Sequence, residues 1–145
     1  MTDASKLRTL QDLEDSDWGD PASGETPLIQ KCLTLRRKPI ADFSIEDLRL
    51  AIGQKMGLTV LIPLAMQHLL RNPLSEGDFY PGDLLQSVLR VPFETWTETE
   101  ALRVSWAHLP SIARGFLDYA KGMDDDQREI FDDLIKSAER AAKFH

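Results

Sequence analysis

Apolar residues recur every three or four positions along almost the whole chain, and this spacing constrains the fold more than any other feature. Ile45, Leu48, Ile52 and Met56 are one example. Residues at these intervals lie on one face of an α-helix, which can pack on a core. The segment LTVLI could form a strand because β-branched residues cluster there, but the neighbouring helical signals favour a helix. The sequence therefore predicts an all-α fold, a single-domain helical bundle of about six to eight helices.

Helix start signals divide this pattern at several points. Thr26 followed by Pro27 predicts an N-cap and a first helical turn. Ser44 predicts a second N-cap, and Asp47 three residues later forms an imperfect capping box with it. Gly57 predicts the left-handed C′ residue that ends the second helix. These signals indicate two separate helices before a third, more apolar one.

The later helices are predicted from their apolar content and from prolines and glycines. A helix at about 59–71 is apolar on most sides, which is typical of a helix at the centre of a domain. Pro63 is expected in its first turn, where the missing N–H costs little. Pro110 is expected to restart a helix. Asp124 to Asp126 are expected to open a single last helix, where negative charge suits the helix dipole.

Length and cysteine content bound the class of protein. A chain of 145 residues can bury its own core, so we expect one domain over 1–145, with 1–25 as a loosely packed acidic segment. Cys32 is the only cysteine, which suits a reducing compartment. The longest apolar run has nine residues, too few to cross a bilayer. We expect a cytoplasmic protein that does not enter membranes.

Charge is distributed unevenly along the chain. The formal net charge is −7. Residues 1–27 hold two basic and seven acidic residues, whereas residues 28–43 hold four basic residues and one acidic residue. Contacts with a nucleic-acid backbone require clustered Lys and Arg, so direct nucleic-acid binding is not expected. A basic protein partner would instead be attracted by the acidic field.

Known patterns for catalysis and for metal binding are missing from the sequence. His68, His108 and His145 are isolated, and no glycine-rich phosphate loop, HExxH or GxSxG motif accompanies them. Cys32 has the spacing of a core residue. The acidic stretches lack the spacing of a calcium loop and the Glu-x-x-His pairs of a di-metal bundle. We expect no enzyme activity, no metal and no cofactor.

The stretch EGDFYPGDLL brings three carboxylates close together. Tyr80 and Pro81 predict the N-cap and first position of a helix. Asp83 then falls at the third position, where its carboxylate can accept the N-cap N–H. Glu76 and Asp78 have no such local role. They are either solvated residues at a structural corner or part of a partner-binding face.

The segment LRLAIGQKMGLTVLIPLAMQHLLRNPLSEGDFYPGDLLQSVL resembles the immunity proteins of bacterial contact-dependent growth inhibition (CDI) systems. EDLRLAIGQ, the apolar GL…PLA helix and NP…EGDFYPGDLL carry the resemblance, and the acidic LEDSDWG before them adds to it weakly. The resemblance implies a small cytoplasmic protein without enzyme activity. It also implies a partner, the C-terminal toxin domain of a large secreted effector. Such toxins are commonly nucleases, and immunity proteins often block their active sites.

Two acidic segments are candidate contacts, because a shared string such as GDFYPGDLL is more suited to fixing the fold than to distinguishing toxins. We prefer the N-terminal segment, where Trp18 could anchor the interface among charges. The second segment contains Asp124 to Asp126, Glu129, Asp132 and Asp133, and the first three are already explained by a helix start. The candidate toxin-binding residues are Asp12, Glu14, Asp15, Asp17, Trp18, Asp20, Glu76 and Asp78.

The leading hypothesis is therefore an acidic protein, monomeric when free, that neutralises a basic nuclease toxin. A helical adaptor that binds another partner through an apolar groove is one alternative. A carboxylate-dependent hydrolase that uses Glu76, Asp78 and Asp83 is the other.

Overall fold

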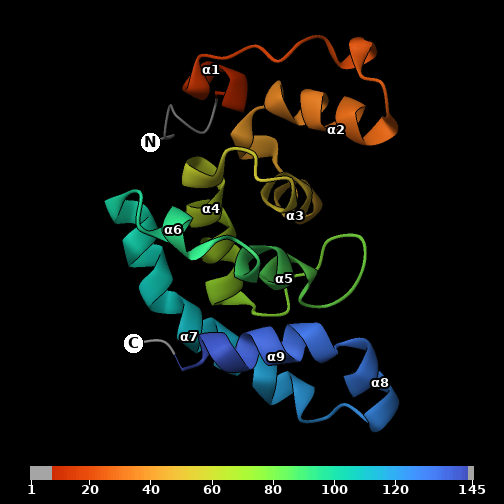
Figure 1. Cartoon of the computed structure of the whole chain (residues 1–145), viewed down its shortest axis with the longest axis vertical. Helices are drawn as coiled ribbons and strands as arrows, with labels where there is room; N and C mark the ends of the chain where they lie inside the picture. The colour runs from red at the N-terminus through yellow and green to blue at the C-terminus, as the bar shows by residue number, and fades with distance from the viewer. Residues whose placement is uncertain (1–7, 144–145) are drawn as a thin grey trace.

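The computed structural model describes residues 8–143, which contain nine α-helices, two short 3-10 helices and no strand (Figure 1). The all-α prediction is confirmed. The α-helices are α1 (Leu10–Glu14), α2 (Pro27–Arg36), α3 (Ile45–Gly53), α4 (Leu58–Arg71), α5 (Asp83–Leu89), α6 (Phe93–Trp96), α7 (Glu100–Ala120), α8 (Asp125–Ile130) and α9 (Asp132–Ala141). The 3-10 helices are η2 (Pro21–Ser23) and η3 (Ile40–Asp42).

The helices are arranged along one long axis. Figure 1 shows α1 and α2 at one end, α8 and α9 at the other, and α3, α4 and α5 between them. Helix α4 contacts α3, α5 and α7, and α7 also packs on α9. In the described part of the chain no helix is both long enough and apolar enough to cross a membrane.

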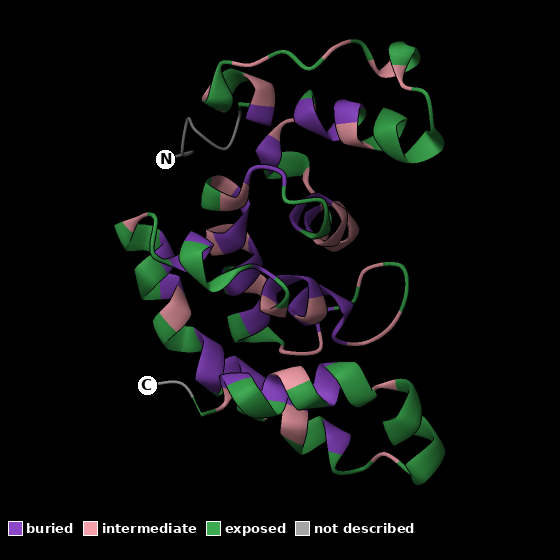
Figure 2. Ribbon diagram, viewed as in Figure 1, coloured by how far each residue is buried: buried purple, intermediate pink, exposed green. Residues whose placement is uncertain are grey.

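The hydrophobic core is centred on α4, as its apolar sequence predicts. Leu61, Ile62 and Leu69 of this helix are fully buried. The same core extends to Phe116 of α7 and to Leu134 of α9. Figure 2 shows the buried residues on the inward faces of these helices and exposed residues along α8 and the ends of the molecule.

The predicted helix starts of α2 and α3 are confirmed. The Thr26 hydroxyl accepts from the Ile29 N–H, and Pro27 begins α2. Ser44 and Asp47 form a complete capping box, in which each side chain accepts the other residue's backbone N–H at 3.0 Å. Local sequence alone decides these positions because all the hydrogen-bonding partners lie within three residues.

Two prolines lie deeper inside helices than expected. Pro63 is the sixth residue of α4, beyond its first turn, and α7 continues without a break through Pro110. Each proline removes one backbone hydrogen bond and would break an isolated helix. Pro110 is itself buried, and Leu109 and Ile112 beside it are also buried. The packing of α7 therefore offsets the local cost.

The predicted last helix is two helices. Asp124 and Gln127 form the capping box that opens α8, but α8 ends at Ile130, and Phe131 separates it from α9. Helix α8 has no buried residue, whereas Phe131 packs edge-on against Tyr80, with ring centroids 5.4 Å apart. The division places the aromatic ring of Phe131 against the α4–α5 connection.

Candidate functional site

The acidic arm, defined here as residues 12–20, crosses one side of α2. Leu10, in the helix that begins the arm, is fully buried. Its side chain lies against Gly57, where a Cβ atom would come within 2.5 Å of Leu10 Cδ2. Gly57 has the predicted left-handed backbone, with φ +57°, but its predicted place at the end of the preceding helix is wrong, because α3 ends at Gly53 and Gly57 is the N-cap of α4. Glycine is required at this position both by the space that Leu10 occupies and by the backbone conformation.

Arg36 of α2 is buried under the arm and binds it through its guanidinium group. Only 1% of this residue is exposed. Its Nη1 bonds to Glu14 Oε1 at 2.5 Å, and its Nη2 donates to the Ser16 carbonyl at 2.9 Å. The Arg36 guanidinium lies 3.8 Å from the centroid of the Trp18 ring, a cation–π contact. Arg36 Nε is buried and has no hydrogen-bond partner within residues 8–143.

Trp18 is held by this contact but remains open to solvent. Its exposed fraction is 54%, and its Nε1 donates to Ser16 Oγ at 3.1 Å. Asp17 beside it accepts from the Gly19 N–H at 2.8 Å and from Arg37 Nη2 at 3.3 Å. The backbone hydrogen bond from Gly19, together with Arg37, lowers the pKa of Asp17, so this carboxylate is ionised at neutral pH.

The other carboxylates of the arm differ in their local roles. Asp12 closes a capping box with Thr9 at the start of α1, and Asp20 caps η2 through the Ala22 N–H. Asp15 ends α1 in a left-handed conformation with φ +48°, and its carboxylate has no hydrogen bond to any residue that the structure describes. All three are exposed, so their charges face solvent even where the oxygens cap a helix.

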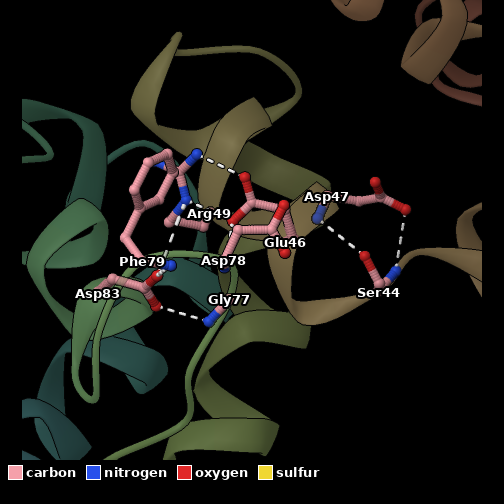
Figure 3. A network of polar contacts seen from close by, with 8 residues as sticks. All are labelled: Ser44, Glu46, Asp47, Arg49, Gly77, Asp78, Phe79 and Asp83. Carbon is pink, nitrogen blue, oxygen red and sulfur yellow. Dashed lines mark hydrogen bonds and ion pairs between the residues drawn. The ribbon is translucent and has the colours of Figure 1, made fainter.

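A second candidate region is the α4–α5 loop, residues 72–82, which is anchored through Asp83 (Figure 3). Asp83 is only 2% exposed, and its oxygens accept from the Gly77 N–H at 2.7 Å and the Phe79 N–H at 3.1 Å. The predicted N-cap at Tyr80 is wrong, because α5 begins at Asp83 and is preceded by Gly82. The Asp83 carboxylate therefore binds the preceding loop and not the N-cap.

The position of Gly82 explains this shift in the helix start. Gly82 has φ +90°, and a Cβ atom there would meet Phe116 at 2.9 Å and Leu134 at 3.1 Å. Close packing against α7 and α9 therefore fixes this turn. Those partners are far away in sequence, so the local pattern gave no signal for it.

Glu46 of α3 anchors the same loop from the other side, as Figure 3 shows. Arg49 binds both Glu46 oxygens at 2.6 Å, and Glu46 Oε1 also accepts from the Asp78 N–H at 2.9 Å. The Arg49 guanidinium lies 4.5 Å from the centroid of the Phe79 ring. The hydrogen bonds from Arg49 lower the pKa of Glu46. Sequence reasoning missed this anchor because Glu46 and Asp78 are 32 positions apart.

The three carboxylates of the loop stretch are not brought together as a catalytic group. Asp83 is buried and occupied by backbone N–H groups, whereas Glu76 and Asp78 are exposed. No group of His, Cys, Asp or Glu within residues 8–143 is arranged to hold a metal ion. Burial raises the pKa of the Cys32 thiol, which disfavours the reactive thiolate.

Asp78 and the acidic arm belong to different sides of α2. Asp78 lines a cleft between α2 and α3, together with Lys31 of α2 and Glu46 of α3. No residue of the acidic arm lines this cleft. Figure 1 shows the arm on the side of α2 that faces away from α3. The candidate residues thus form two surfaces that share α2.

The remaining acidic segment lies at the opposite end of the molecule. Asp124 caps α8, and Asp132 pairs with Lys136 at 2.9 Å. Ile130, at the end of α8, is 78% exposed. The aromatic residue of this segment, Phe131, packs against Tyr80 and is less exposed than Trp18.

Comparison with known proteins gives one family. Residues 12–105, well over half of the chain, match the family model of CDI immunity proteins. The matched part begins in the acidic arm, contains the α4–α5 loop and ends within α7. No curated protein and no solved structure matches the chain.

Proposed function

The chain belongs to the family of CDI immunity proteins, and from this premise we propose that it neutralises a basic nuclease toxin by covering the toxin's active site with the acidic arm. Membership of the family makes the chain an inhibitor of a cognate toxin protein and not an enzyme. The nuclease, the acidic contact surface and the blocked active site are the proposed parts. The charge and geometry of the arm support each of them.

The observation that carries the proposal is the exposed Trp18 ring on a buried arginine. An aromatic side chain that is already fixed in the free protein loses little conformational freedom on binding, which favours its use as an interface anchor. The ring is fixed by Arg36 and Ser16 while more than half of the residue's surface remains exposed. A free surface tryptophan without such support would be a weaker candidate.

The charges around Trp18 suit a nuclease active site. An enzyme that cleaves nucleic acid must hold phosphates with Lys and Arg, and these side chains leave a basic surface when no substrate is bound. Asp15, Asp17 and Asp20 present exposed carboxylates within three positions of Trp18. We expect them to speed the encounter with the toxin and to orient it, while Trp18 contributes more to the lifetime of the complex.

The location of the protein follows from the same proposal. A nuclease damages a cell where nucleic acid lies, so its inhibitor is expected in the cytoplasm. The single cysteine is compatible with that reducing compartment. We further propose that the free protein is a monomer.

The test uses the toxin domain encoded immediately upstream, purified in a catalytically inactive form. Trp18→Ala should weaken its binding by about ten- to a hundredfold, as expected for an aromatic anchor. Phe93→Ala is the matched control, because Phe93 is another aromatic residue with 60% exposure, on α6. Equal affinities for wild type and Trp18→Ala would contradict the proposed site.

The salt dependence of binding separates the charge-based proposal from the adaptor alternative. Raising the salt concentration screens exposed charges, so the association rate should fall with salt and should fall less for a variant with Asp15→Asn and Asp20→Asn. Asp125→Asn, on exposed α8, is the acidic control. Association that is insensitive to salt, with a contact surface on an apolar groove, would support the adaptor.

A further inference from the structure

A wide cleft lies between α2 and α3, and the acidic arm does not line it. It has a volume of ≈ 480 Å³, in the range of protein sites that take a small ligand or a few residues of peptide. Leu35 and Leu50 supply apolar contacts, and Gln30 and Thr34 supply polar ones. The cleft is thus shaped to receive something with both apolar and polar parts.

Most charges in the cleft already have partners. Lys38 bonds to Asp47 at 2.6 Å, and Glu46 is held by Arg49. Lys31 of α2 and the Asp78 carboxylate of the α4–α5 loop have no ion pair with any residue in the described range. The charge of Lys31 acts on nearby Glu46 and helps to lower its pKa. The cleft therefore presents one positive and one negative charge without an ion pair, from two different elements.

The walls that carry these charges are fixed before binding. Asp78 sits between two anchored positions, because its own N–H is held by Glu46 while the flanking Gly77 and Phe79 N–H groups are held by buried Asp83. Lys31 projects from the middle of helix α2. Two opposite charges carried on anchored backbone favour a partner with the matching arrangement and oppose others.

We propose that this cleft receives a loop of the same toxin, with a basic side chain that pairs with Asp78 and an acidic side chain that pairs with Lys31. The proposal rests on the proposed function, because it takes the partner to be the toxin domain. Charge complementarity requires a segment with both signs. Helix α2 connects the two surfaces, since Arg36 supports the arm on one side and Lys31 faces the cleft on the other. The toxin would then contact both sides of α2.

Charge reversal tests the pairing, with the inactive toxin domain as probe. Lys31→Glu and Asp78→Lys should each weaken binding by about tenfold or more, because each places like charges together. Asp78→Lys should keep the wild-type melting temperature, since the Asp78 carboxylate has no ion pair to lose. Lys31→Glu places a second negative charge near Glu46, so its affinity is compared after circular dichroism has shown that the variant is folded. Lys121→Glu and Asp118→Lys are the matched controls, since these residues form an exposed pair at the end of α7.

A neutral variant separates insertion of a loop from attraction at a distance. Thr34→Trp would fill the cleft without changing charge, and it should weaken binding as strongly as charge reversal does. Thr59→Trp, at an exposed position of α4, is the control. Wild-type affinity in Thr34→Trp would overturn the proposal even if both charge variants bound weakly.

The outcomes distinguish this inference from the proposed function. If Trp18→Ala weakens binding while the three cleft variants bind like wild type, the cleft is unused and the acidic arm stands. If the cleft variants weaken binding and Trp18→Ala does not, the cleft stands and the arm is not the contact. If the wild-type protein does not bind the toxin domain, the proposed function is overturned and the cleft loses its partner with it.

Discussion

At the scale of single residues, burial separates carboxylates that look equivalent in the sequence. Asp78 and Asp83 lie five positions apart in one acidic stretch, yet Asp78 is exposed and Asp83 is 2% exposed. A buried carboxylate is stable only when its oxygens are hydrogen-bonded, and Asp83 meets this condition with two backbone N–H groups. Asp83 therefore shapes the loop, and Asp78 remains available to a partner.

Asp83→Asn should lower the free energy of unfolding by about 1–3 kcal/mol, because the amide can accept with only one atom and leaves a loop N–H without its partner at a buried side chain. Chemical unfolding followed by circular dichroism measures this. Asp78→Asn is the control and should unfold like wild type. If Asp83→Asn is less stable but binds the toxin normally when folded, Asp83 has a structural role. If the folded variant loses affinity, Asp83 lies in the interface.

Arg36 is the second buried charged residue with a defined role, and Arg36→Met tests it. The variant removes the contacts to Glu14, Ser16 and Trp18, so the acidic arm should open locally, at a cost of about 1–2 kcal/mol because Glu14 can return to solvent. Amide hydrogen exchange in the arm should rise, while exchange in α4 changes little. Arg37→Met is the control, because Arg37 is exposed and its guanidinium pairs with exposed Asp17. An unchanged exchange rate in the arm would show that Arg36 does not hold it.

At the scale of elements, the sequence predicted the helix starts that depend on neighbouring residues. It missed the helix limits that depend on packing against distant segments. The capping residues Thr26 and Ser44 were predictable because their partners lie three positions away. Three other features were not predictable: the start of α5, the continuity of α7 through Pro110 and the division at Phe131. Each of those depends on side chains from distant segments, which local spacing cannot reveal.

The same limit applies to the candidate site. The composition of the acidic arm, with Trp18 among carboxylates, was visible in the sequence. The support from Arg36 was not visible, because Arg36 lies 18 positions beyond Trp18 and local spacing does not bring the two residues together. The sequence also could not show which charged side chains of the cleft lack an ion pair, since this depends on the side chains that the fold brings next to them.

The junction between α3 and the α4–α5 loop should weaken in acid. At this junction the hydrogen bonds from Arg49 to Glu46 lower the folded-state pKa of Glu46 below the ordinary 4.5. The ionised Glu46 carboxylate therefore stabilises the fold above that pH. The contribution is lost as the pH falls through the lowered pKa. Glu46→Gln should therefore be less stable than wild type at pH 7, and the difference should shrink below pH 4.5. Unfolding measured from pH 7 to pH 3 checks this.

Exposed Glu98 gives the control for that pH series, and Glu98→Gln should follow the wild-type curve at every pH. If the difference between Glu46→Gln and wild type stayed constant across the range, the stabilisation would come from shape and not from the ionised carboxylate.

At the scale of the whole molecule, the family match and the hydrophobic core have different limits. The match ends at residue 105, inside α7. The core continues beyond it, through Phe116 to Leu134 and Ala138 of α9. Leu134 meets the turn at Gly82 that begins α5. The matched part therefore depends on α9 for the packing behind its α4–α5 loop, which supports the proposal of one domain.

Leu134→Ala tests that dependence, because it opens a cavity at the contact between α9 and α5. The loss should be about 2–5 kcal/mol, as for other large-to-small changes at buried positions. In a single domain this loss lowers hydrogen-exchange protection in α3 and α4 as much as in α9, and thermal unfolding stays one transition. Ile130→Ala, at a position 78% exposed, should change stability by less than about 0.5 kcal/mol. Protection lost only in α7 to α9 would instead show two units that unfold separately. The α4–α5 loop would then not depend on α9 for its stability.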